Sequence, residues 1–513
     1  MNRKSISAFV VAAIILLPIV FLPFSGDQSI FALGGKMLFE GKLLYHDYVD
    51  LKPPMVFIFY GFISLFAGTS EIGFRIFEFI WQLSTIFILF KVVKNYFSLN
   101  AAQAAVIIFS AVYTSMNFSQ TLQPESFMNM IAILLIWLQL RGKNNIFSAL
   151  AKGALIGFAT SFKFTFGIFL IIILIDDLFN SDSKLQFIKN SIVTILAMAL
   201  TFALSFIPLM SSHSYEGFKN VIQYLNFYSA YPPVNLALFK EALIKLSVFW
   251  GDNFSIALLF LVGAGLFKYF TESEKQAEQR KIVLIANFIL LLLFSIIVEK
   301  KFHEYHFQRM LIPLSIAAGI GFVLLFEKIK NVKGCNLYCK IMAGGFLILL
   351  VMLSPFPRLI NIAKVPIIAL TDTEKYNQIY DLEGSSQIIR SQYIAVSSYI
   401  HENFPKGSKI ILIATGSNQI NLMLYPEYQI SKFSQSIFYL GNGAPDDWKI
   451  DAKREINNAD ALIIQTNDAN PLITGHEFTS MQSIEQDPKL YEIIKNKFVK
   501  YELTKDFIIF KRK

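Results

Sequence analysis

Long runs of apolar residues alternate with short polar connections along the first 357 residues of the chain. Runs of about 17–25 apolar residues can cross a bilayer as helices. The pattern predicts about eleven spanning helices, near residues 6–23, 72–93, 101–116, 126–140, 146–162, 164–180, 190–210, 242–267, 282–298, 309–326 and 341–356. The first run lacks a small-residue cleavage site, so we expect a retained span. The fold class is therefore a mainly α-helical, polytopic membrane protein.

Every second connection between these runs is basic. Arg3 and Lys4 precede the first run, and Lys or Arg residues follow the second, fourth, sixth, eighth and tenth runs. Loops on the cytoplasmic side are enriched in Lys and Arg, so we expect the N-terminus inside and, after an odd number of spans, the C-terminal segment outside. Cys335 and Cys339 lie in a basic loop, where we interpret them as reduced, inert thiols instead of a metal or redox pair.

The first expected outer loop, residues 24–71, holds two further apolar stretches. Residues 28–41 suit an amphipathic helix lying in the membrane interface. Its lipid-facing side chains are expected to be Ile30, Phe31, Leu33, Met37 and Leu38. Pro53 and Pro54 then open the stretch 55–67, which is too short to span comfortably and is interpreted as interfacial or re-entrant.

The end of the chain has a different pattern. Residues 1–357 are expected to form the transmembrane domain, 358–390 a linker, and 391–513 a small extracytoplasmic α/β domain. Short β-branched runs predict strands, and Ser391–Asn403 suits a helix. The expected strands cover residues 409–414, 461–465, 499–503 and 506–510, the last two as a hairpin. We interpret this domain as a structural cap over the outer face.

Composition agrees with lipid as the main solvent. Hydrophobic residues make up 54% of the chain and charged residues only 16%, against about 25% in soluble proteins. The net charge of +9 is explained by basic residues that flank the apolar runs. We therefore expect a membrane-lipid environment and no nucleic-acid partner.

Ionisable residues gather at the edges of the expected outer loops. Charges at membrane depth are costly unless they are paired or line a wet cavity, so their gathering on one face predicts a site. The residues are Asp27, Asp47, Asp50, Lys52, Glu125, Lys163, His303, His306 and Arg309.

Asp27, followed by Tyr45-x-Asp47 and Asp50-x-Lys52-Pro53-Pro54, resembles the first outer loop of GT-C membrane glycosyltransferases. Within them it is similar to bacterial relatives of protein O-mannosyltransferases and of the lipid A aminoarabinose transferase. The resemblance extends over residues 5–325. Its further motifs are Gly73-Phe74-Arg75, Gln123-Pro124-Glu125 and Phe162-Lys163.

The resemblance implies an inverting glycosyltransferase at the outer face of a bacterial inner membrane, acting in glycan or lipopolysaccharide modification. Its partners would be a polyprenyl-phosphate-linked sugar and a glycan, lipid or protein acceptor. By resemblance Asp27 is the catalytic base, assisted by Glu125. Donor-phosphate ligands would be Lys52, Lys163 and Arg309. Further substrate-site candidates are Tyr45, Asp47, Asp50, Arg75, His303 and His306.

The chain departs from the family pattern at two positions. Gln28 follows Asp27 where a second acid is frequent, and Leu51 precedes Lys52 where the aminoarabinose-transferase type carries a metal-binding Glu. No cofactor or metal is therefore assigned. A divalent metal is left open, with His303, Glu304 and His306 as a zinc alternative.

Each candidate also has a structural alternative. Asp27 could end the first span, Lys52 could be a snorkelling anchor, and Glu125 could complement a helix dipole. Arg75 could pair with an acid at helical spacing, and Lys163 could mark a turn. The rival functions are a transporter or flippase of lipid-linked sugars and a non-catalytic membrane scaffold.

Overall fold

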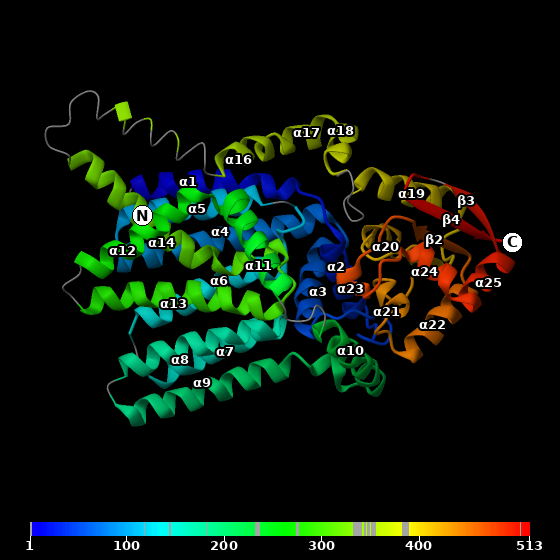
Figure 1. Cartoon of the computed structure of the whole chain (residues 1–513), viewed down its shortest axis with the longest axis horizontal. Helices are drawn as coiled ribbons and strands as arrows, with labels where there is room; N and C mark the ends of the chain where they lie inside the picture. The colour runs from blue at the N-terminus through cyan, green and yellow to red at the C-terminus, as the bar shows by residue number, and fades with distance from the viewer. Residues whose placement is uncertain are drawn as a thin grey trace. The chain divides into compact units, whose positions relative to one another are not determined.

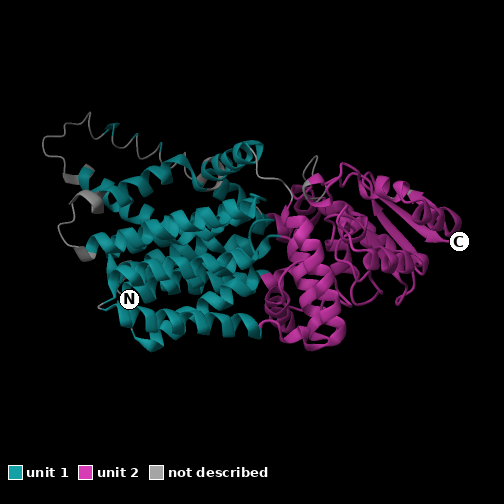
Figure 2. Cartoon of the chain, turned by 60° about the horizontal axis from the view of Figure 1, so that its bottom comes forward, with its two compact units in different colours: residues 1–22, 75–204, 234–367 teal, residues 23–74, 205–233, 368–513 magenta. Residues whose placement is uncertain are grey.

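The computed structural model of the chain contains two units, each assembled from separate segments (Figure 2). It describes residues 3–116, 118–142, 145–181, 183–230, 236–272, 276–331, 341–342, 345, 349, 355–381, 389–502 and 504–513. Unit 1 consists of Met1–Leu22, Arg75–Leu204 and Val234–Ile367. Unit 2 consists of Pro23–Phe74, Ser205–Pro233 and Ile368–Lys513. Cys335 and Cys339 lie outside the described residues, as does most of the expected last span.

Long helices form unit 1 (Figure 1). Ser98 and Asn145 cap two of them by accepting the backbone N–H three residues on. The helices of unit 1 are α1 Arg3–Leu16, α4 Glu71–Tyr96 (which begins in unit 2), α5 Leu99–Ser115, α6 Pro124–Leu140, α7 Ile146–Phe162, α8 Ile168–Asn180, α9 Lys184–Leu204, α11 Leu236–Val248, α12 Ile256–Glu272, α13 Gln276–Glu299, α14 Leu311–Asn331 and α16 Phe356–Ala363, with α17 Val365–Thr371 running into unit 2. Short turns η1 Leu17–Phe21, η2 Phe164–Gly167, η4 Phe249–Phe254 and η5 Glu304–Met310 connect them.

Unit 1 has the surface of a protein that lies in lipid. Along α9 large apolar side chains are exposed at helical spacing, which water would disfavour. They are Leu185, Ile188, Ile192, Leu196 and Leu200. Four described helices are long and apolar enough to cross a membrane: Glu71–Tyr96, Lys184–Leu204, Glu278–Glu299 and Glu304–Lys328. These features indicate a multi-pass membrane protein, while the count of eleven spans and the orientation stay predictions.

The expected span at 242–267 is wrong as one continuous helix. The structure divides it into α11 and α12, separated by the π-helical turn η4 and by Ser255. Ser255 has φ +70°, a left-handed backbone conformation that no helix interior tolerates. Hydropathy averaged over the run does not register this break, because three aromatic residues of the turn offset its Gly-Asp-Asn sequence.

A four-stranded sheet organises the tail within unit 2. The strands are β1 Ile410–Ile413, β2 Ala461–Gln465, β3 Phe498–Glu502 and β4 Phe507–Arg512, in the order β1-β2-β4-β3. β1 and β2 are parallel, with Ile410 opposite Ala461, and the other two pairs are antiparallel. The predicted strands are confirmed, and so is the first helix of the tail, α19 Arg390–Asn403.

Short helices complete unit 2 around this sheet and around two helices of the first loop, α2 Gly26–Phe39 and α3 Pro54–Ala67. The others are η3 Ile207–Met210, α10 Ser212–Ala230, α18 Thr373–Ile379, α20 Gln419–Leu424, α21 Ile437–Leu440, α22 Asp446–Asn457, α23 Pro471–Thr474, α24 Ser480–Gln486 and α25 Pro488–Lys497.

The prediction that the apolar side of α2 faces lipid is wrong. Ile30, Phe31, Leu33 and Met37 are buried inside unit 2, where α2 packs against α3. Gly35 permits the close approach, since a Cβ there would lie 2.8 Å from the carbonyl carbon of Tyr60. The periodicity predicted an apolar face correctly, but the same pattern suits lipid and a second apolar helix alike.

The first loop and the tail are bound together within unit 2. The Val49 N–H donates to the Lys432 carbonyl at 2.7 Å, and the Ser434 N–H donates to the Val49 carbonyl at 3.1 Å. Arg390 forms a two-pronged ion pair with Glu71, at 3.1 and 2.9 Å. Such paired bonds fix orientation as well as distance. Segments more than 300 residues apart therefore complete one another's structure.

Candidate active site

The ends of several helices in unit 1 bring four charged side chains together. Glu125 lies in the first turn of α6, Lys163 follows α7, Glu299 ends α13, and Arg309 lies in η5. Gln123 and Ser126 form a capping box around Pro124, which starts α6 and sets the direction of Glu125. The extended backbone of Lys163 (φ −160°) ends α7 and turns its side chain out of the helix.

Two cations share two carboxylates in this cluster. The Lys163 Nζ lies 2.9 Å from Glu125 Oε1 and 2.7 Å from Glu299 Oε2. Arg309 Nη2 lies 3.2 Å from Glu125 Oε1 and also pairs with Glu299. Thr165 and Ser295 accept from Arg309 Nη1, each at 3.1 Å. The formal charges balance, which offsets the cost of burying them.

The members differ in exposure. The side chains of Arg309, Glu125 and Glu299 are 0%, 1% and 8% exposed, whereas that of Lys163 is 26% exposed. Lys163 is thus the member best placed to meet a ligand. Sequence reasoning did not single out Glu299; its signal was an acid at the end of an apolar run, just before His303.

His306 belongs to the same cluster. Its Nε2 lies 2.8 Å from Lys163 Nζ, and its Nδ1 lies 3.1 Å from Glu299 Oε2. Because an ammonium can only donate, the neutral ring carries its proton on Nδ1, facing Glu299. His303 stacks on Tyr305 at 5.5 Å, and Glu304 pairs with Gln120. In the described part of the chain, no three His, Cys, Asp or Glu side chains are placed to hold a metal ion.

Arg75 forms a separate buried network in unit 1. Its guanidinium donates to the Leu22 carbonyl (3.0 Å), Glu78 (2.8 Å), Thr121 (2.9 Å) and the Phe118 carbonyl (3.0 Å). Glu78 also accepts hydrogen bonds from the Tyr113 hydroxyl and from the Leu122 N–H. These bonds hold the segment that leads into α6, so the contacts favour a positioning role for Arg75 over contact with substrate.

The second cluster lies in unit 2, on and near α2. Asp27 occupies the first turn of α2 and is half-buried. The neighbouring Gln28 accepts from the Ser25 N–H at 2.7 Å and completes a capping box. The residue that departs from the family pattern therefore has a structural role, because it fixes the start of the helix that carries Asp27.

Asp50 is the buried acid of this cluster. It accepts from the Lys52 N–H at 2.9 Å and from Ser434 Oγ at 2.7 Å. Burial raises the pKa of Asp50, against the lowering effects of Lys52 and Ser434, and the nearby charge of Asp27 raises it further. The Lys52 Nζ lies 5.4 Å from the centre of the Phe31 ring. Asp27, Asp50 and Lys52 are thus neighbours, as the sequence predicted.

Tyr45 and Asp47 shape the turn before this acid. Tyr45 is buried with φ +66°, and its hydroxyl donates to the Lys52 carbonyl at 2.7 Å. Asp47 accepts from the Leu43 N–H at 2.8 Å and lies 2.8 Å from His46. Although burial alone would raise the pKa of Asp47, these two partners lower it. Both residues hold the loop in shape.

Comparison with known proteins supports the resemblance to GT-C membrane glycosyltransferases. A family model described as dolichyl-phosphate-mannose-protein mannosyltransferase matches residues 51–211. The structure of ArnT from Cupriavidus metallidurans bound to undecaprenyl phosphate aligns with a TM-score of 0.61 and 12% identity, covering 99% of this chain and 98% of that chain. An oligosaccharyltransferase from Archaeoglobus fulgidus, tethered with an acceptor peptide, aligns with a TM-score of 0.53 and 12% identity, covering 99% and 74%. No curated protein matches in sequence.

Proposed function

We propose that this chain is an inverting glycosyltransferase. It moves a sugar from a polyprenyl-phosphate donor to an acceptor hydroxyl at the outer face of a bacterial inner membrane. The family match and the likeness to a fold that binds undecaprenyl phosphate in ArnT support the reaction class. The alternation of basic loops supports the outer face.

The reaction replaces one bond to the anomeric carbon by another. The acceptor oxygen attacks this carbon, and the bond to the phosphate oxygen breaks. The phosphate leaves with the electron pair, still attached to its lipid, and the hydroxyl proton passes to a carboxylate. The protein therefore has to supply a base for the proton and cations for the developing phosphate charge.

Asp27 is the base in this proposal. It is half-buried, so a hydroxyl can reach it, and it lies in the first turn of α2. The partial positive charge of a helix N-terminus favours a carboxylate over a carboxylic acid. Asp50 is buried and already accepts two hydrogen bonds, which makes it a poorer acceptor for a substrate proton.

Lys163 is the cation that binds the donor phosphate, and its exposure within a buried ionic cluster is the observation that carries the proposal. Its Nζ lies within 3 Å of Glu125, Glu299 and His306. A phosphate must therefore replace one of these partners, and His306, which carries no negative charge, is the weakest. Buried Arg309 pairs with the same two carboxylates and stays in contact with them when Lys163 meets the phosphate.

Glu125 positions the two cations of the cluster, since it pairs with both Lys163 and Arg309. Lys52 is the phosphate ligand that the family resemblance implies, and Asp50 and Tyr45 hold the backbone on which it stands.

The test uses purified full-length protein in lipid nanodiscs with a panel of labelled polyprenyl-phosphate sugars and a membrane-glycolipid extract as acceptor. Asp27→Asn should lower kcat roughly 10²–10⁴-fold, the usual contribution of a general base, while the donor still binds. Lys163→Gln should instead weaken donor binding. Glu492→Gln and Lys94→Gln, exposed positions in the same two units, are the matched controls.

Full turnover by Asp27→Asn would overturn the base assignment. If wild-type protein turned over no donor but moved labelled lipid-linked sugars across a vesicle membrane, the flippase alternative would replace the enzyme.

A further inference from the structure

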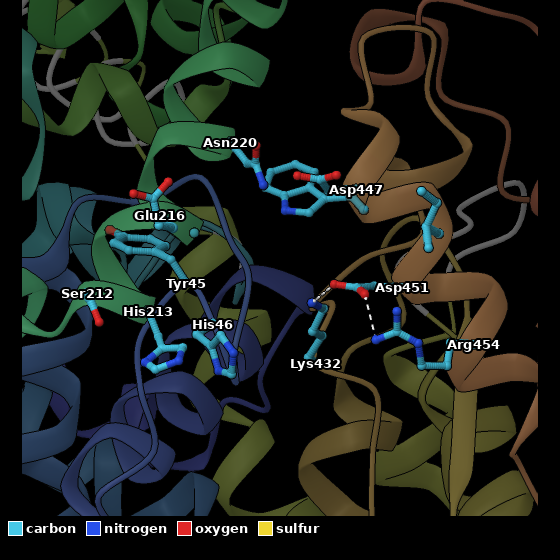
Figure 3. A pocket seen from close by; sticks show the side chains of 13 residues that line it. Tyr45, His46, Ser212, His213, Glu216, Asn220, Lys432, Asp447, Asp451 and Arg454 are labelled. Atoms are coloured by element: carbon cyan, nitrogen blue, oxygen red, sulfur yellow. Dashed lines mark hydrogen bonds and ion pairs between the residues drawn. The ribbon is translucent and has the colours of Figure 1, made fainter.

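A cavity of about 450 Å³ opens within unit 2 (Figure 3). Its walls come from α10, from α22, and from the turn that carries Tyr45 and His46. This volume falls in the range of roughly 300–1,000 Å³ that small-molecule sites occupy. The residues of the first cluster in unit 1 do not line it, and neither do Asp27 and Lys52.

The lining combines apolar surface with hydrogen-bond donors and acceptors. Its hydrogen-bonding side chains include His46, His213, Glu216, Asn220, Asp451 and Arg454. In Figure 3 the two histidines and Glu216 lie on one wall, and Asp451 and Arg454 lie on the other. Carboxylates accept, the guanidinium donates, and an amide or imidazole can do both. A ligand with many hydroxyl groups needs this alternation, because each hydroxyl is both donor and acceptor.

Most charged side chains of the lining already have a partner of opposite charge. Lys432 and Arg454 both pair with Asp451, Arg454 at 3.2 Å, and Glu216 pairs with Lys219 at 2.8 Å. An anion would have to displace one of these carboxylates, whereas a neutral or amino-bearing sugar can add hydrogen bonds to groups that stay paired.

Two aromatic side chains of the cavity lining, Trp448 and Tyr45, pack against other aromatic rings. Trp448 is buried, and its ring lies 5.6 Å from Phe438 and 5.9 Å from Tyr224. Tyr45 packs 5.2 Å from Phe218. A wall whose side chains are fixed before binding loses little entropy when a ligand enters.

Tyr45 also connects the cavity to the predicted site. Its ring lines the cavity, and its hydroxyl donates to the Lys52 carbonyl at 2.7 Å. Gly217 of α10 lies so close to the Tyr45 carbonyl that no side chain fits between them. Tyr45 is therefore part of the cavity lining and is also hydrogen-bonded to the backbone of Lys52, the candidate phosphate ligand.

We propose that this cavity binds the carbohydrate portion of the acceptor, a neutral or amino-bearing glycan. The inference rests on the proposed glycosyltransferase function and names its acceptor class. A peptide would need a free strand edge or a continuous apolar groove, whereas the side chains of α10, α22 and two loop segments that line this cavity mix charged, polar and apolar groups.

The test measures binding without turnover. Full-length protein in nanodiscs is applied to an array of immobilised oligosaccharides (neutral, amino-sugar and uronic-acid) and Ser/Thr-containing peptides. Wild type should bind at least one neutral or amino-bearing glycan. Glu216→Gln and Arg454→Gln should each lower this affinity about 10–100-fold, the effect of losing a hydrogen bond to a charged group. Glu492→Gln, at an exposed position of the same unit, should bind like wild type.

Thermal unfolding of each variant separates lost binding from lost folding, and Asn220→Ala provides a third, uncharged probe of the wall. Absence of glycan binding by wild type, preferential binding of peptides, or unchanged affinity in all three folded variants would overturn the inference. Glycan binding without sugar transfer from any donor would instead refute the proposed reaction.

Discussion

At the scale of single residues, the sequence predicted a set of candidate side chains, and the structure adds the partners that they contact. Asp27, Asp50 and Lys52 are close in sequence, and the structure places them close together. Ser434, which donates to Asp50, is 384 positions away. Glu299 pairs with Lys163 and Arg309 and was not singled out. Partners contributed by distant segments leave no local pattern in the sequence, which is why they were not predicted.

Asp50 and Asp47 should respond to pH with opposite sign. Burial raises the pKa of Asp50, so the folded state keeps a proton that the unfolded state releases above about pH 3.9. Stability is therefore lost as the pH rises towards the folded-state pKa, and Asp50→Asn should unfold at a higher temperature than wild type at pH 8, with the gain shrinking towards pH 4.

Asp47→Asn is the matched control. The folded-state pKa of Asp47 is lowered, so its contribution is present above the unfolded pKa and disappears as the pH falls. Compared with wild type, this variant should be less stable from pH 8 down to about pH 4, and the deficit should shrink only below about pH 4. Thermal unfolding of full-length protein from about pH 2 to pH 8 measures both variants, and parallel profiles would contradict the assignment.

At the scale of elements, periodicity predicted where helices and strands lie. It did not predict what packs against their apolar faces. The apolar face of α2 was predicted, but it packs on α3 and not on lipid. The start of α2 also contacts the tail. A Cβ on Gly26 would collide with the carbonyl oxygen of Gly416 in the loop after β1, and both sides of this contact belong to backbone.

Gly26→Ala should therefore destabilise unit 2 by about 1–3 kcal/mol, the usual cost of overpacking. Gly263→Ala is the control, because nothing lies within 4 Å of its Cβ position and Ala favours a helix over Gly by up to about 1 kcal/mol. The unfolding temperature and the rate of sugar transfer should both fall for Gly26→Ala only. Equal unfolding temperatures for the two variants would contradict the close contact.

At the scale of the whole molecule, the sequence predicted a membrane-embedded part followed by a separate domain, with boundaries at 357 and 391. The structure has two compact units built from interleaved segments, and residues 391–513 belong to unit 2 together with residues 23–74 and 205–233. Composition separates the apolar helices from the polar tail, but it contains no information on which outer loop the tail joins. That assignment depends on single pairs such as Arg390 with Glu71.

The predicted orientation can be tested with single cysteines in a variant whose Cys335 and Cys339 are replaced by Ser. A cysteine at Lys406, a side chain that is 76% exposed in unit 2, should react with an impermeant thiol reagent added to intact cells. A cysteine at Ser183, exposed in an expected basic loop, should react only after the membrane is opened. The reverse pattern would place the candidate site in the cytoplasm.

The union of the first loop with the tail also sets the order in which the protein can mature on the ribosome. Residues 23–74 leave the ribosome early, whereas Arg390, Gly416 and Ser434, which complete their packing, follow more than 300 positions later. At roughly 5–20 residues per second, the 315 residues between 74 and 390 take about 15–60 s to synthesise. During that interval the segment that carries Asp27 lacks the contacts that complete its packing, so unit 2 can assemble only after residues 390–434 have been synthesised.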